Sequence, residues 1–140
     1  MTRILGIDYG TRRIGIAIAD RETKIATPLT TIDGRNDVTR DARAVVDLAT
    51  RETAAEFVVG LPLNMDGTDS EQTALTRRFS GELERLSQLP VHLFDERLSS
   101  YAADAVMDDA GIRQKGRKGL TDRVAAQKIL QAFLDADGKW

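Results

Sequence analysis

Three acidic residues from distant parts of the chain, Asp8, Glu96 and Asp122, are of the type that binds a divalent cation. Asp8 ends an apolar run, Glu96 follows another apolar run, and Asp122 opens a helical pattern. Carboxylates that converge repel one another unless cations neutralise them. Their hard oxygen ligands suit Mg²⁺ or Mn²⁺. If the fold brings the three residues together, we expect a metal site whose ligands are these three carboxylates.

Each acid alone also has an ordinary structural interpretation. Asp8 could be a solvated acid at the end of a strand, and Glu96 could be a loop acid that pairs with Arg97. Asp122 could favour the dipole of the helix in whose first turn it is expected. The chain has 22 acidic residues, so some coincidence is expected. The joint placement of the three is therefore better evidence than any one of them.

Basic residues lie close to these acids. Residues 111–119 read GIRQKGRKG, and this glycine-spaced basic loop directly precedes the helix of Asp122. Cations on such a loop can follow a phosphate backbone, although a solvated loop is the commoner role of a charge run. The same two interpretations apply to the arginines beside Asp8 and Glu96. The candidate substrate-binding residues are Arg12, Arg13, Arg97, Arg113, Lys115, Arg117 and Lys118.

The sequence predicts the elements that must position these side chains. Short apolar runs between turn residues predict strands at residues 3–8, 13–20, 24–32, 56–60 and 91–95. Pro28 marks the third strand as an edge strand or an irregular one. Apolar residues at helical spacing predict helices at about residues 38–49 and 75–86, from Ser99 or Ser100 through Val106, and at residues 124–134. Asp33 or Asn36 is the expected cap of the first helix.

The order of these elements predicts an α/β fold. Three successive strands favour an antiparallel meander, and strands joined through helices should be parallel neighbours. The result is a mixed five-stranded sheet with helices on its faces. Asp8 and Glu96 then leave the sheet at its carboxyl edge, where ligands bind in open α/β sheets. Asp122 heads the apolar stripe of Ala126, Ile129 and Phe133, so it should point toward the same edge.

The composition limits the class of protein. A chain of 140 residues suits one domain, residues 1–140. The net charge of −2 excludes a wholly basic nucleic-acid binder but allows a basic patch. The chain has no cysteine, no signal-peptide pattern and no apolar run of the roughly 18 residues that a membrane span needs. We therefore expect a cytoplasmic protein without membrane contact, either a monomer or a homodimer.

Four segments resemble, in order, the motifs of the YqgF (RuvX) family of bacterial RNase H-like proteins. They are GIDYGTRRIGIAIAD, GLPLNMDGT, DERLSS and TDRVAAQKILQAFLD, and the likeness extends from about Ile4 to Leu134. Members of this family are described as pre-16S rRNA nucleases and also as Holliday junction resolvases. The acids of its motifs match Asp8, Glu96 and Asp122. The resemblance thus implies an RNase H-like fold, a nucleic-acid partner and catalysis by these three acids.

Hydrolysis of a phosphodiester bond needs an activated water, a stabilised leaving oxygen and neutralised charge, and two metal ions can supply all three. The first hypothesis is a metal-dependent endonuclease that processes precursor 16S rRNA in ribosome biogenesis, and the alternative is a resolvase of four-way DNA junctions. A non-catalytic nucleic-acid-binding module ranks below both. DYGT also resembles the phosphate loop of actin-like ATPases, but those proteins need two such domains. We expect His92 and Asn64 to be structural.

Overall fold

The computed structural model describes residues 2–99 and 118–136. The expected helix from Ser99 or Ser100 through Val106 falls almost entirely on residues 100–117, which lie outside the described residues. In chain order, the described elements are β1 (Arg3–Tyr9), β2 (Arg13–Asp20), β3 (Ile25–Asp33), α1 (Val38–Glu52), β4 (Ala54–Leu61), α2 (Glu71–Ser87), β5 (Val91–Asp95), the 3₁₀ turn η1 (Glu96–Leu98) and α4 (Lys118–Ala136).

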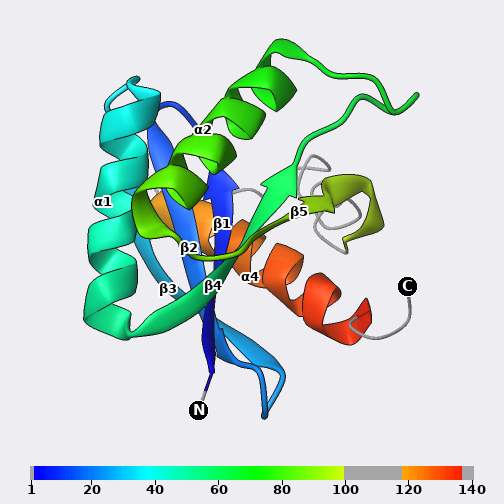
Figure 1. Cartoon of the computed structure of the whole chain (residues 1–140). Helices are drawn as coiled ribbons and strands as arrows, with labels where there is room; N and C mark the ends of the chain where they lie inside the picture. Colours follow the sequence, from blue (N-terminus) through cyan, green and yellow to red (C-terminus); the bar gives the residue numbers. More distant parts are fainter. Residues whose placement is uncertain (1, 100–117, 137–140) are drawn as a thin grey trace.

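The described strands form one mixed sheet in the order β3-β2-β1-β4-β5 (Figure 1). β1 pairs antiparallel with β2, and β2 pairs antiparallel with β3. β4 runs parallel to both β1 and β5, because helices connect these strands. The α/β prediction of a five-stranded sheet with antiparallel and then parallel strands is confirmed. Pro28 lies on β3, an edge strand of the sheet, where a residue without an N–H is tolerated.

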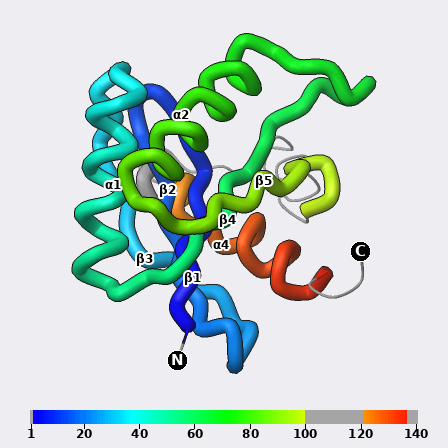
Figure 2. The backbone as a smooth tube through the Cα atoms, in the orientation of Figure 1, coloured from blue at the N-terminus to red at the C-terminus, as the bar shows by residue number. Residues whose placement is uncertain are grey.

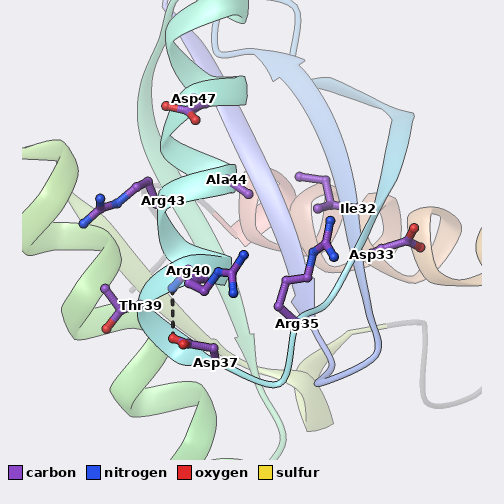
Figure 3. Close-up of a pocket in the computed structure, with 9 residues that line it drawn as sticks. All are labelled: Ile32, Asp33, Arg35, Asp37, Thr39, Arg40, Arg43, Ala44 and Asp47. Carbon is purple, nitrogen blue, oxygen red and sulfur yellow. Dashed lines mark hydrogen bonds between the residues drawn. The ribbon is translucent and has the colours of Figure 1, made fainter.

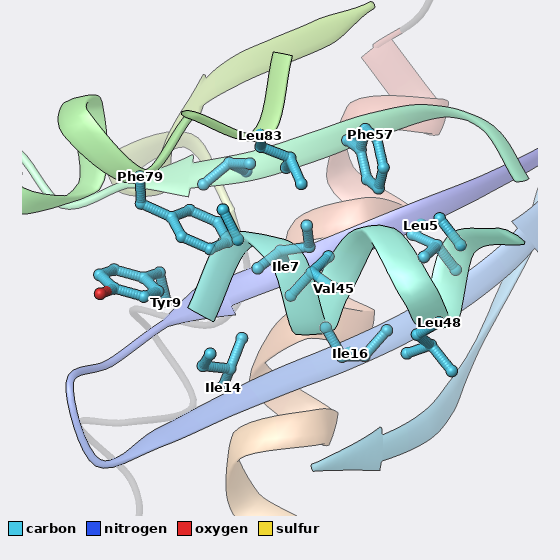
Figure 4. Packing of buried hydrophobic residues seen from close by; sticks show 13 residues of the cluster. Leu5, Ile7, Tyr9, Ile14, Ile16, Val45, Leu48, Phe57, Phe79 and Leu83 are labelled. Atoms are coloured by element: carbon cyan, nitrogen blue, oxygen red, sulfur yellow. The ribbon is translucent and has the colours of Figure 1, made fainter. Parts of the chain in front are cut away.

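Helices cover both faces of the sheet. α1 and α2 lie together on one face, and α4 crosses the other face behind β3, β2, β1 and β4 (Figure 2). The strand residues alternate accordingly: Leu5 and Ile7 of β1 pack toward α1 and α2, whereas Ile4 packs toward α4. Figure 4 shows the first of these two cores, in which the rings of Tyr9 and Phe79 stack with centroids 4.2 Å apart.

Several sequence-based boundaries differ from the structure, and β1, for example, ends at Tyr9 and not at Asp8. Helix α1 is capped by Asp37, whose carboxylate accepts a bond from the Arg40 N–H, and not by Asp33 or Asn36. Asn36 instead adopts a left-handed backbone conformation with φ 52°. Helix α4 begins at Lys118, so Asp122 lies inside the helix and not in its first turn.

No helix in the described ranges is both long enough and apolar enough to span a membrane.

Candidate active site

Asp8 and Glu96 lie on the α4 face of the sheet at its carboxyl edge. Asp8 alternates with Ile7, which packs on the opposite face, so its side chain points toward α4. Glu96 begins the 3₁₀ turn directly after β5 and lies over β4: a Cβ atom placed on Gly60 would be 3.0 Å from the Glu96 Cγ. A side chain at position 60 would therefore occupy the space of the Glu96 carboxyl group.

Asp122 reaches this edge because Gly15 has no side chain. Gly15 pairs directly opposite Asp8 in the ladder between β1 and β2. A Cβ atom on Gly15 would lie 2.0 Å from the Asp122 carbonyl oxygen, which is far inside van der Waals contact. Glycine at this position lets α4 lie directly on β2, and the backbone of Asp122 comes beside the strand pair that contains Asp8.

The electrostatics of the three acids link them into one site. Burial and, to a smaller extent, the charge of Asp122 together raise the pKa of Asp8 to about 7. Burial, followed by the charges of Asp8 and Asp95, likewise raises the pKa of Glu96 to about 7. The structure thus places Asp8 within electrostatic reach of both Asp122 and Glu96. A pKa near neutrality marks two carboxylates that are costly to ionise without a cation.

The donor chemistry of the site fits a hard divalent cation. Within residues 2–99 and 118–136, neither the Asp8 nor the Glu96 carboxylate receives a hydrogen bond or forms an ion pair, so both remain available as ligands. The Asp122 carboxylate differs from these two, because its Oδ2 accepts a hydrogen bond of 2.7 Å from the Arg13 Nε. Over the same residues, no group of three or more His, Cys, Asp or Glu side chains is arranged to hold a metal ion. The fit therefore rests on the oxygen donors of Asp8 and Glu96, with Asp122 paired to an arginine.

The basic candidates divide into bonded and free groups. The Arg97 guanidinium is bonded to Asp95 through Nη2 at 2.7 Å and donates through Nη1 to the Met65 carbonyl at 3.1 Å. It thereby fastens the loop after β4 to the turn that carries Glu96. Arg12 is exposed, and its guanidinium makes no hydrogen bond or ion pair with the described residues.

The basic loop before α4 falls mostly outside the structure. Arg113, Lys115 and Arg117 lie outside the described residues, and Lys118 is the first residue of α4. Their predicted contact with substrate stays a prediction.

Two residues that the sequence marked as structural make structural contacts. The Nδ2 of Asn64 donates to the Thr68 hydroxyl at 3.0 Å within the loop after β4. The Nε2 of His92 lies 2.9 Å from the Oε1 of Glu56, which also accepts bonds from Arg21. This ion-pair cluster lies near the amino ends of β4 and β5, at the opposite end of these strands from Glu96.

Sequence reasoning did not foresee the pairing of Arg13 with Asp122 or the contacts of Gly15 and Gly60. A glycine in the middle of an apolar strand is the available signal, because it often marks a close approach of another segment. Which segment approaches, and which residue of it, depends on the position of α4 over the sheet.

The sheet order, the helices on both faces and the acids at the carboxyl edge define an RNase H-like protein. Two solved structures of RuvC from Thermus thermophilus share this fold. One has a TM-score of 0.64 at 15% identity and covers 96% of this chain and 95% of its own. The other, RuvC in complex with a Holliday junction substrate, has a TM-score of 0.62 at 14% identity and covers 97% and 94%. These likenesses concern the fold.

Sequence comparison then gives the family. Residues 2–136 match the family described as "RuvX: Holliday junction resolvase". A protein of Moorella thermoacetica named "Putative pre-16S rRNA nuclease" is 42% identical over 98% of this chain and 97% of its own length. A protein of the same name from Rhodopseudomonas palustris is 41% identical over 94% and 82%, respectively. The chain belongs to the RuvX family.

Proposed function

We propose that this chain is a metal-dependent endonuclease that hydrolyses phosphodiester bonds in the processing of precursor 16S rRNA, in the cytoplasm. The observation that supports it most is the convergence of two half-buried carboxylates, Asp8 and Glu96, with Asp122 at the carboxyl edge of the sheet. The pKa values of Asp8 and Glu96 near 7 mean that the apo site resists full ionisation, as expected where cations complete the charge balance. The family and the names of the relatives support the same activity.

The proposed ligands of Mg²⁺ or Mn²⁺ are Asp8, Glu96 and Asp122. When bound, two such ions supply an activated water, a stabilised leaving oxygen and neutralisation of the phosphate charge. Asp8 holds the central position because it is the acid whose charge acts on Glu96 and that feels the charge of Asp122. Arg13 holds the Asp122 side chain at the site through its 2.7 Å bond.

The substrate is held by basic groups around the acids. Arg12, on the turn directly after Asp8, is exposed and free to bind a phosphate. Arg13 and Arg97 are the proposed contacts on either side of the acids, and both also bond a carboxylate of the chain. The residues proposed to deliver the backbone from the segment before α4 are Arg113, Lys115, Arg117 and Lys118.

A second candidate function is the resolution of four-way DNA junctions in recombination and repair. The description of the RuvX family favours it, because that description is "Holliday junction resolvase". Both candidates use the same acids and ions and differ in the nucleic acid that is cut.

One cleavage assay separates the candidates. Precursor 16S rRNA, an unrelated single-stranded RNA and a four-way DNA junction are incubated with the protein in Mg²⁺, in Mn²⁺ and in EDTA. Asp8→Asn and Glu96→Gln are the test variants, and Glu84→Gln, a change at an exposed acid of α2, is the matched control. We expect wild type and control to cleave the precursor in Mg²⁺ or Mn²⁺ but not in EDTA. The test variants should not cleave it in any of the three. Cleavage of the junction alone would select the second candidate, and full activity of Asp8→Asn would refute both.

A further inference from the structure

A second polar surface lies near the candidate active site. It is a cleft of about 670 Å³ between the end of β3 and the first half of α1, and Figure 3 shows the residues that line it. The guanidinium groups of Arg35 and Arg40 point into the space between α1 and the neighbouring strands, whereas Arg43 extends from another side of the helix (Figure 3). Two cations from different elements thus face one open cleft.

These arginines differ from most others of the described chain because they are not paired. Ion pairs are formed by Arg3, Arg13, Arg21, Arg77, Arg85 and Arg97. Arg12, Arg35 and Arg40 are exposed and form no hydrogen bond through their guanidinium groups, and no ion pair, with the described residues. Fold stability does not account for them, since exposed cations without partners contribute little to it.

The cleft lies close to the turn that follows the strand of Asp8. Asp37 and Thr39 line both this cleft and a smaller one of about 360 Å³, which is also lined by Tyr9 and Thr11. The loop that carries Arg35 is bonded to the turn after Asp8 through the Gly34 N–H, which donates to the Arg12 carbonyl at 2.8 Å. The path from the acids to the cleft therefore crosses a single short turn.

The cleft also contains acids, and their positions limit their effect on an anion at Arg35 and Arg40. The Asp37 carboxylate is bonded to the first turn of α1 as its cap. Asp33 points away from α1, and Asp47 lies further along the helix (Figure 3). The basic end of the cleft is therefore the end nearest the turn with Arg12.

We infer that Arg35 and Arg40 bind the phosphate backbone of the substrate strand outside the reacting phosphate, so that the strand passes from the three acids over the turn of Arg12 into this cleft. The inference rests on the proposed nuclease function. It adds that substrate binding extends to the face of the sheet covered by α1. Phosphate is the ligand that unpaired, forked guanidinium groups recognise.

The test measures binding apart from cleavage. Fluorescence anisotropy in EDTA follows a labelled single-stranded RNA of about 30 nucleotides and one of about 6, over a range of salt concentrations. The test variant is Arg35→Gln/Arg40→Gln. The matched control is Arg51→Gln/Arg85→Gln, which removes two arginines from the last turns of α1 and α2, at the far ends of both helices. Thermal melts check that both variants are folded.

Loss of two phosphate contacts should lower the slope of log K against log[salt] by about 1.4 for a single strand. Between 50 and 200 mM salt, the test variant should therefore lose about sevenfold less affinity for the long strand than wild type does. The short strand and the control should keep wild-type behaviour. An unchanged slope in the test variant would overturn the inference and leave this cleft of mixed charge to a protein partner.

The two proposals fail in distinguishable ways. If Asp8→Asn abolishes cleavage while Arg35→Gln/Arg40→Gln keeps the wild-type affinity and slope, the nuclease function stands and the inference fails. If the double variant weakens binding but no nucleic acid is cleaved in any ion, the binding surface stands and the nuclease function fails. Wild-type protein that binds neither strand at low salt would refute the inference outright.

Discussion

Asp8→Asn should abolish cleavage and at the same time stabilise the apo protein. Burial raises the pKa of Asp8 from 3.8 to about 7, so the folded state holds a proton that the unfolded chain has released. The stability that this proton provides is complete below pH 3.8 and is lost as the pH rises to about 7. Asparagine carries no charge at any pH, so the variant does not suffer this loss.

The magnitude follows from the size of the shift. The change in the Asp8 pKa from 3.8 to about 7 corresponds to an upper limit of about 4 kcal/mol, because each pKa unit is equivalent to about 1.36 kcal/mol. Part of this repulsion is shared with Asp122 and Glu96, and a buried amide must find its own hydrogen bonds. We therefore expect Asp8→Asn to gain about 1–3 kcal/mol of unfolding free energy at pH 8, and close to nothing at pH 3.5.

Urea unfolding in EDTA at these two pH values measures the effect, with Asp47→Asn as the control at an exposed acid. Adding Mg²⁺ at pH 8 should reverse the order, because an ion that binds only the folded wild type stabilises it and gives little to the variant. A variant that is equally destabilised at both pH values would contradict the electrostatic reasoning. Equal stabilisation of wild type and variant by Mg²⁺ would contradict the ligand role of Asp8.

Three further changes test the packing and the ion pairs around the site. Gly15→Ala should cost about 3 kcal/mol in urea unfolding and reduce cleavage, because its Cβ would lie 2.0 Å from the backbone of α4. Gly81→Ala, whose Cβ meets nothing within 4 Å in helix α2, should instead gain about 0.5–1 kcal/mol. Glu56→Gln should lower the free energy of unfolding by about 2 kcal/mol at pH 7 and by less at pH 4. The bond from Arg21 lowers the pKa of Glu56, so the stability that the ionised carboxylate provides is lost as the pH falls below 4.5. Arg97→Ala should lower kcat more than Arg97→Lys, with unchanged melting temperature, if it positions the Glu96 turn.

The sequence predicts the sheet because its patterns are local. Strand runs, helical spacing and the change from short turns to helical connections determine which neighbours are antiparallel and which parallel. The placement of Asp8 and Glu96 at one edge follows from that topology alone. The cap of α1 was not predicted correctly, since Asp33, Asn36 and Asp37 are all competent caps and the backbone geometry of the loop selects among them.

The contacts of the arginines could not be predicted in the same way. Arg13 and Arg97 each adjoin a candidate acid in sequence or in the predicted topology, and both are long enough to reach several partners. Arg13 bonds Asp122, which is 109 residues away in sequence, and Arg97 bonds Asp95 and the Met65 carbonyl. These choices depend on the distance between α4, β2 and the loop after β4, which is a property of the packed fold.

Glycines on three neighbouring strands explain how the packing of α4 on the sheet provides both a hydrophobic core and the candidate active site. A Cβ atom on Gly6, Gly15 or Gly60 would lie 2.6, 2.0 or 2.6 Å from an atom of α4, so all three strands admit the helix at close range. Close packing lets the apolar residues of α4 fill the core against β1, β2 and β4, and it brings Asp122 to the acids at the edge. The raised pKa of Asp8 is a consequence of the same approach, because the helix that excludes water from Asp8 also brings the second negative charge. A cation at this edge therefore relieves a repulsion that the packing of the fold itself creates.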